Sequence, residues 1–226
     1  MIVSNKISTI FLQIILSILL IFGIGACQVK NESAKDTLPY YNSPDFTPLW
    51  FSTKKEAAKE ITHTIADFNF KDQTGQIFSR SNLKGKIHVA DFFFTACGSI
   101  CPKMTTQLLQ VQSTFKNDPM VLILSYSVTP WLDSVSRLRR FAERRKINAS
   151  QWHLLTGNKS EIYKLARQSY FAEETTGYNK DSIEFLHTEH LILVDSDGRI
   201  RGLYNGTLAL ETERLIHDIK VLELEP

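Results

Sequence analysis

The sequence predicts a single α/β domain built on a mixed β-sheet with helices on both sides. From about residue 64 onward, short apolar or alternating runs typical of strands take turns with segments of helical spacing. The runs at 87–94 and 120–125 are almost entirely apolar, as expected for strands covered on both faces. Near the C-terminus, two short apolar runs flank the turn Asp195-Ser-Asp-Gly198, which is typical of an antiparallel hairpin.

Length and composition favour one folded domain. The chain has 226 residues, of which 43% are hydrophobic, which is enough for one sizeable core and too little for two comfortable domains. A net charge of +2 gives no indication of a nucleic-acid partner. We expect a signal peptide at 1–26, a lipidated cysteine and flexible tether at 27–60, and the folded domain at 61–226. Within the polar stretch, the part at 28–40 is expected to be the tether and the part at 41–60 to be loosely ordered.

The first 26 residues are typical of a secretory signal. Lys6 is their only charge, an apolar run follows at 10–22, and small residues precede Cys27. The ending Ile24-Gly-Ala-Cys27 resembles a bacterial lipobox, which implies cleavage before Cys27 and a diacylglycerol group on its sulfur. An uncleaved membrane anchor is the alternative, because the apolar run is about long enough to span a bilayer. Either way we expect the domain on the extracytoplasmic (periplasmic) side, tethered to a membrane.

The elements of the domain follow from periodicity and turn signals. A hairpin comes first, and buried strands then alternate with helices. The expected elements are strands at 65–70, 76–78, 87–94, 120–125, 152–155, 191–194 and 200–204, and helices at 81–85, 102–115, 133–146, 159–168 and 212–222. Parallel crossovers followed by a late antiparallel hairpin look like a thioredoxin-like mixed sheet with flanking helices and an N-terminal β-hairpin extension.

Cys97 and Cys101 lie where a buried strand gives way to a helix. Four residues apart on a first helical turn, their side chains share one face and are roughly 6 Å apart. They can close a disulfide, or both thiolates can bind one soft ion. The N–H groups of the helix N-terminus should lower the pKa of Cys97. A purely structural disulfide is the less attractive reading, because it would close a very short loop and stabilise the fold little.

The chemistry of the pair depends on its redox state. If Cys27 carries lipid, Cys97 and Cys101 are the only thiols left, and outside the cytoplasm they should form a disulfide unless a metal or a reductase keeps them reduced. Two thiolates with an imidazole suit copper, and thiolates select Cu(I) in particular. Zinc tolerates the same ligands but usually takes four protein ligands in a structural site.

The residues around the cysteines resemble one known family. The run Phe92-Phe-Phe-Thr-Ala-Cys97-Gly-Ser-Ile-Cys101-Pro-Lys-Met104, the later Ser127-Val-Thr-Pro130, and a histidine eleven residues before the glycine of an Asp-Gly turn are similar to the Sco/SenC family. Its members are copper-binding thioredoxin-fold proteins that help to assemble the copper centre of cytochrome c oxidase. The resemblance covers 62–222. It implies a copper chaperone for Cu(I) or Cu(II) whose partner is the oxidase subunit carrying that centre, or another copper acceptor.

The resemblance also implies a third ligand. His187 is followed by Thr188 and, eleven residues on, by Gly198, so His187 matches the family histidine. It is expected on a loop that faces the cysteines, just before a strand. His190 is expected to be partly exposed or hydrogen-bonded rather than a ligand, and the other four histidines to be structural or solvated. Many family members have an aspartate where this chain has Thr129, so a partner contact or tuning through that acid would be lost while the metal site stays intact.

Other functions remain open at this point. A thiol-disulfide reductase would use Cys97 to attack and Cys101 to resolve, without His187; the absence of proline between Pro130 and Pro226, where thioredoxins place a cis-proline, weighs against a routine dithiol oxidoreductase. A copper or redox sensor would bind copper without delivering it. A peroxidase is disfavoured, because peroxiredoxins typically have a Thr-x-x-Cys arrangement, whereas Thr95 lies only two residues before Cys97.

The helix expected at 133–146 has a basic outer face. Solvated charge explains such a face, and a docking surface for an acidic partner or for lipid headgroups is the alternative. The residues that form it are Arg137, Arg139, Arg140, Arg144 and Arg145.

Overall fold

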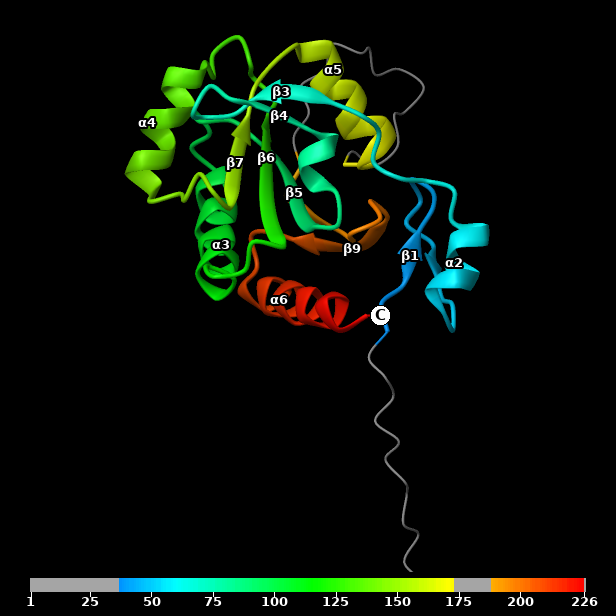
Figure 1. The fold of residues 1–226 in the computed structure, drawn as a ribbon. Helices are drawn as coiled ribbons and strands as arrows, with labels where there is room; N and C mark the ends of the chain where they lie inside the picture. The colour runs from blue at the N-terminus through cyan, green and yellow to red at the C-terminus, as the bar shows by residue number, and fades with distance from the viewer. Residues whose placement is uncertain (1–36, 173–187, 226) are drawn as a thin grey trace, which may run out of the picture. The chain divides into compact units, whose positions relative to one another are not determined.

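The computed structural model describes residues 37–172 and 188–225, and it confirms the thioredoxin-like mixed sheet with flanking helices (Figure 1). A seven-stranded sheet has the order β2-β1-β9-β8-β5-β6-β7, and β3 and β4 form a separate pair. The strands are β1 (Tyr40–Tyr41), β2 (Pro48–Leu49), β3 (Asn69–Lys71), β4 (Ile77–Ser79), β5 (Ile87–Phe93), β6 (Val121–Ser127), β7 (Trp152–Leu155), β8 (His190–Val194) and β9 (Ile200–Asn205). The helices are α2 (Lys54–Glu60), the 3-10 helix η1 (Arg80–Leu83), α3 (Ile100–Thr114), α4 (Val135–Arg145), α5 (Lys159–Lys164), the π-helical turn η2 (Leu165–Ser169) and α6 (Ala209–Leu224).

Three of the predictions concern residues that the structure does not describe. The signal peptide and Cys27 lie within residues 1–36, and His187 lies within residues 173–187. The described residues, 37–172 and 188–225, belong to one compact unit. A chain that starts at residue 28 therefore keeps every contact described below.

The centre of the sheet is the parallel pair β5 and β6. All seven residues of each strand are buried, which explains their nearly continuous apolar sequences. Their register runs from Ile87 opposite Val121 to Phe93 opposite Ser127. On the outer side of β6, β7 is also parallel, whereas β8 is antiparallel to β5 and to β9. The predicted combination of parallel crossovers and a late antiparallel hairpin is confirmed.

Each face of the sheet has its own core. One apolar cluster joins the strands to α3, α4 and α6, and the other joins them to α5, η2 and the hairpin β3–β4. In Figure 1, α6 lies below the sheet and α5 above it. Successive residues of a strand point to opposite faces, so Val89 and Phe93 of β5 belong to the first cluster while Ala90 and Phe92 belong to the second.

The loops after β5 and β6 and the loop before β8 lie at the same edge of the sheet. The carboxyl ends of the parallel strands β5, β6 and β7 lie at this edge, and so does the amino end of the antiparallel strand β8. The loop after β6 is joined to the end of β5 by a hydrogen bond from the backbone N–H of Val128 to the carbonyl oxygen of Phe93 (2.9 Å). The cysteines follow β5 at the same edge.

Residues 40–60 are more structured than the sequence suggested. Instead of a loosely ordered stretch, they contain β1, β2 and α2, and Tyr41 of β1 lies opposite Ile200 of β9. The guanidinium of Arg201 stacks over the ring of Tyr40 at 3.8 Å and donates hydrogen bonds to the carbonyls of Leu38 and Pro39. These contacts join segments far apart in the chain, so no local sequence pattern predicts them.

Two further differences are small. The helix expected at 159–168 is α5 followed by the π-helical turn η2. The first hairpin strand is confined to Asn69–Lys71, because the chain before it follows other contacts, such as the hydrogen bond from the N–H of Ile65 to the carbonyl of Gly198. Within the described ranges, every helix is too short or too polar to cross a bilayer.

Candidate metal centre

Cys97 and Cys101 lie on either side of the start of α3. Cys97 is half-buried in the turn after β5, where its N–H bonds the carbonyl of Phe94 (3.2 Å). Cys101 is the second residue of α3 and is 5% exposed, within the apolar cluster beneath the helix. Both cysteines are free, and each thiol is near enough to influence the pKa of the other. The two cysteines therefore adjoin at the junction of β5 and α3, with Cys97 in the turn before the helix rather than on its first turn.

The two thiols differ in acidity. Burial raises the pKa of Cys97, but the backbone N–H groups of Cys101, Ser99 and Ile100 outweigh it, so that the pKa lies below its usual value. For Cys101, burial dominates, and together with the nearby Cys97 thiol it raises the pKa to about 12. Cys97 is thus the more acidic thiol of the pair, whereas Cys101 keeps its proton near neutral pH.

A buried carboxyl lies on the same face of the sheet as Cys101. Asp91 of β5 is 3% exposed and accepts a very short hydrogen bond from the hydroxyl of Ser125, whose oxygen accepts one from the indole N–H of Trp152 (2.8 Å). Burial raises the pKa of Asp91 to about 7, and the negative charge of Asp91 in turn raises the pKa of Cys101. Asp91 was not among the residues predicted to be functional, although a lone acid inside an otherwise apolar strand was a usable signal.

A second buried acid organises the loop after β6. Asp133 is fully buried and accepts hydrogen bonds from the hydroxyls of Ser127 (2.6 Å) and Thr129 (3.0 Å). Thr129 therefore has a role of its own: its hydroxyl helps to fix the carboxylate of Asp133. The resemblance drew attention only to the aspartate that Thr129 replaces, and Asp133 was not predicted to have a role.

The same carboxylate anchors the loop that carries Cys97. Asp133 accepts hydrogen bonds from the backbone N–H of Thr95 (3.2 Å) and from its hydroxyl (2.5 Å). Arg137 of α4 donates to the hydroxyl oxygen of Thr95 (2.6 Å) and pairs with Asp133 at 3.4 Å. Thr95 is only two residues from Cys97, so the turn of Cys97 is joined directly to the first turn of α4.

A third metal ligand is not found among the described residues. Within residues 37–172 and 188–225, no three side chains of His, Cys, Asp or Glu are grouped so that they could hold a metal ion. His187 lies outside these ranges. The next residue, Thr188, is buried, and it leads into β8 at the edge of the sheet that carries the cysteines.

His190 lies on the wrong face of the sheet to join the cysteines. Leu191 and Leu193 of β8 belong to the apolar cluster of Cys101, whereas Ile192 and Val194 belong to the other cluster. Side chains alternate along a strand, so His190 points to the face opposite Cys101. This agrees with the expectation that His190 is not a ligand.

Three other histidines have partners of their own, in keeping with structural roles. Their ring nitrogens contact a carbonyl, a phenol and a carboxylate: His63 with Ser169, His88 with Tyr170, and His153 with Asp72.

Comparison with known proteins places this geometry in a family. The family model described as SCO1/SenC matches residues 56–222. The curated relative "SCO1 protein homolog" of Bacillus subtilis (strain 168) is 33% identical over 162 residues, which cover 71% of this chain and 83% of the relative.

Solved structures give the same assignment. A SCO1/SenC family lipoprotein from Bacillus anthracis is similar with a TM-score of 0.62 and 31% identity, covering 72% of this chain and 96% of that one. BsSco, described as a member of the Sco family of cytochrome c oxidase assembly proteins with a disulfide switch, has a TM-score of 0.61 and 32% identity, with coverages of 73% and 95%. Bradyrhizobium japonicum ScoI, solved with copper bound, has a TM-score of 0.56 and 25% identity, with coverages of 70% and 99%. The family match over residues 56–222, together with the paired thiols at the start of α3, means that this chain belongs to the SCO1/SenC family.

Proposed function

We propose that this chain binds one copper ion through Cys97, Cys101 and His187 and passes it to the copper centre of cytochrome c oxidase. The observation that carries the proposal is the pair of free, adjoining thiols at the start of α3. The family supports the choice of metal and acceptor, because one relative was solved with copper bound and another is described as an oxidase assembly protein.

The two thiols fit copper as a cargo. Cys97, half-exposed at the surface and the more acidic of the two thiols, is the first ligand to meet an incoming ion, and soft thiolates favour Cu(I). Cys101 has a pKa of about 12 and must lose its proton to coordinate, so capture releases a proton and weakens in acid. A site with three protein ligands is open enough for an acceptor ligand to replace them one at a time.

The choice of His187 is supported by the direction of β8. Because β8 is antiparallel to β5, with Ala90 opposite Ile192, the chain enters β8 at the edge where β5 delivers the cysteines. His187 immediately precedes Thr188 at that edge. The family motif selects the same residue.

The proposed location is the outer side of a membrane, with Cys27 carrying the lipid. The cleavage-site sequence before Cys27 supports this, and so does the relative from Bacillus anthracis, which is described as a lipoprotein.

Copper stoichiometry tests the proposal. The chain from residue 28 is purified reduced and without oxygen, as wild type, His187→Ala and the matched control His190→Ala. We expect about one copper per chain for the wild type and the control, and clear weakening for His187→Ala, as for the loss of one of three ligands. A wild type that binds no copper tightly would contradict the proposal and favour a dithiol-disulfide reductase. A His187→Ala chain that still supports oxidase assembly would also favour the reductase.

A further inference from the structure

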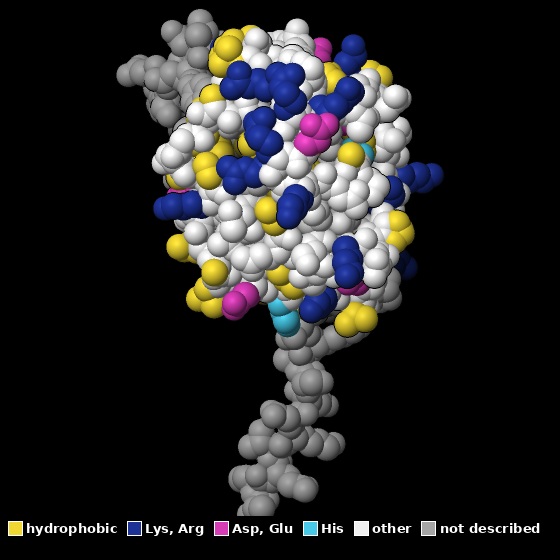
Figure 2. All heavy atoms as spheres, turned by 90° about the vertical axis from the view of Figure 1, so that its left-hand side faces the viewer, with side chains coloured by type: hydrophobic (Ala, Val, Ile, Leu, Met, Phe, Trp, Pro, Cys, Tyr) yellow, Lys and Arg dark blue, Asp and Glu magenta, His cyan; other side chains and the backbone are white. Residues whose placement is uncertain are grey.

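Helix α4 presents a concentration of positive charge. Its eleven residues include five arginines and one glutamate, so the helix carries a net charge of +4. Figure 2 looks at the side of the molecule where α4 lies, and dark-blue side chains gather on its upper half with one magenta group beside them. Arg140 and Arg144 are exposed, and neither forms an ion pair with any residue in the described ranges. Unpaired arginines on one helix favour contact with an acidic surface.

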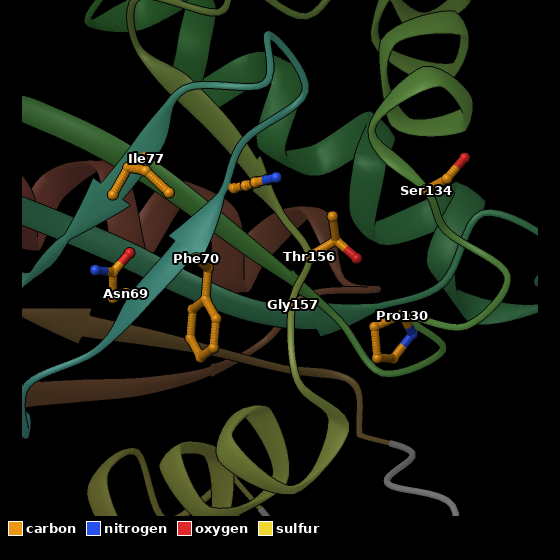
Figure 3. A pocket seen from close by; sticks show the side chains of 8 residues that line it. Asn69, Phe70, Ile77, Pro130, Ser134, Thr156 and Gly157 are labelled. Atoms are coloured by element: carbon orange, nitrogen blue, oxygen red, sulfur yellow. The ribbon is translucent and has the colours of Figure 1, made fainter.

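A hollow lies next to this helix. It has a volume of about 430 Å³ and separates the hairpin β3–β4 from the loop that leads into α4. Figure 3 shows Phe70 and Ile77 of the hairpin on one side of the hollow and Pro130 of the loop on the other. Ile77 is 56% exposed although it is apolar. An open hollow of this size, with both apolar and polar residues in its lining, can accept a side chain of a partner.

More apolar surface and more positive charge surround the hollow. The two residues that follow Pro130 are both exposed, Trp131 at 57% and Leu132 at 49%. The ammonium group of Lys159 stacks over the ring of Trp131 at 4.9 Å. Lys71 lines the hollow itself. Exposed aromatic and aliphatic side chains bordered by cations mark a surface for recognition rather than one that is only solvated.

The helix, the hollow and the cysteines are physically continuous. Arg139 of α4 donates hydrogen bonds to the carbonyls of Gln73 and Thr74 at the tip of the hairpin. At the other end of the same surface, Arg137 donates to Thr95, two residues before Cys97. A partner seated here would therefore lie against the turn that carries the first copper ligand.

We infer that the arginine face of α4 and the hollow beside it form the docking surface for the copper acceptor, an acidic protein face with a projecting apolar side chain. This inference rests on the proposed function, because it assigns the partner of the same metal site. A hollow suits a protein side chain, whereas a bilayer surface has no projection to fill it. Negative groups around the side chain would pair with Arg140 and Arg144 and steer the encounter.

Paired charge reversals test the surface. Arg140→Glu/Arg144→Glu is compared with Lys55→Glu/Lys59→Glu, which makes the same charge change at the same four-residue spacing on exposed positions of α2. The probe is the isolated copper-centre domain of the oxidase subunit from the same organism, and binding and copper transfer are measured at about 20 mM and about 500 mM salt. We expect about tenfold weaker binding at low salt for the α4 variant only, with the difference shrinking at high salt.

A second pair of variants tests the docking surface without changing any charge. Ile77→Ser in the hollow should weaken binding, and Leu210→Ser, an equally simple change at a 75% exposed position of α6, should not. Copper stoichiometry and thermal unfolding of each variant exclude loss of the metal site or of the fold.

The outcomes separate the two proposals. If the wild type neither binds the domain nor transfers copper at any salt, the proposed acceptor is wrong, and the docking surface assigned to it is wrong as well. If the wild type binds the domain and the α4 and Ile77 variants bind equally well, only the docking surface is wrong. If those variants instead lose binding to vesicles of roughly 70% phosphatidylcholine and 30% phosphatidylglycerol while the domain still binds, the surface belongs to the membrane and the inference is overturned.

Discussion

Replacing Asp91 by asparagine should stabilise the protein at alkaline pH and leave it unchanged in acid. The carboxyl of Asp91 is buried beneath α3, and burial raises its pKa from 3.8 to about 7 in the folded state. The folded chain therefore holds this proton more tightly than the unfolded chain. Between about pH 4 and pH 7 the unfolded chain has lost the proton while the folded chain keeps it, so stability falls as the pH rises and levels off above pH 7.

The size of the effect follows from the shift. A difference of about 3 pKa units, at ~1.4 kcal/mol per unit, makes the charged side chain unfavourable by up to ~4 kcal/mol at pH 8. Asparagine cannot ionise, and its carbonyl oxygen can still accept the hydrogen bond from Ser125. We expect Asp91→Asn to be more stable than the wild type by about 2–4 kcal/mol at pH 8 and equally stable near pH 4.

Urea unfolding of the reduced, copper-free chain from residue 28 at pH 4, 6 and 8 measures this difference. Asp72→Asn is a control of opposite sign. Burial raises the pKa of Asp72, but hydrogen bonds from Thr74, His153 and the N–H of Gln76 outweigh it and lower the pKa. That control should lose stability above pH 4 and approach the wild type in stronger acid. A stability difference for Asp91→Asn that is the same at every pH, or a loss of stability at pH 8, would refute the reasoning.

Three further predictions concern the metal centre. Iodoacetamide at pH 7 should modify Cys97 at least about tenfold faster than Cys101, because thiolate reacts and only Cys97 has a lowered pKa; equal rates by mass spectrometry would contradict this. Copper affinity, measured by competition with a chelator, should rise up to about tenfold per pH unit between pH 6 and 8, because Cys101 must release its proton, and a flat profile would count against Cys101 as a ligand. Asp133→Ala should lower the free energy of unfolding by about 2–4 kcal/mol, because it leaves the hydroxyls of Ser127 and Thr129 unpaired. Chemical denaturation measures this loss, and Asp133→Asn should be intermediate. An Asp133→Ala chain as stable as the wild type would refute the anchoring role.

The parts of the fold that depend on local pattern were predictable. The apolar run expected at 87–94 is β5 at Ile87–Phe93, and the short strand expected at 152–155 is β7 with the same bounds. The position of the cysteines at the junction of a buried strand and a helix was predictable for the same reason, but Cys97 lies in the turn before α3 rather than on the first helical turn that it was expected to share with Cys101. These elements were predictable because strands buried on both faces have almost entirely apolar sequences.

The parts that depend on distant contacts were not predictable. The strand β1 is held by β9 and by Arg201, more than 150 residues later in the sequence. The role of Asp133 had no sequence signal, because a lone carboxylate does not reveal which hydroxyls the fold will bring to it. His187 remains a prediction from the motif alone.

The asymmetry of the two thiols would suit the proposed transfer of a metal ion. Cys97 lies ahead of α3, where backbone N–H groups have no helical partner and can stabilise a thiolate. Cys101 lies within the first turn, with its side chain packed in the core, so nothing comparable offsets its burial. In the proposed transfer, the more accessible and more acidic Cys97 would hold an ion alone during arrival or departure, and the buried Cys101 would join only when its proton leaves. Ligand exchange can thus proceed in steps from one side, and that side is the one joined through Thr95 to Arg137 of α4.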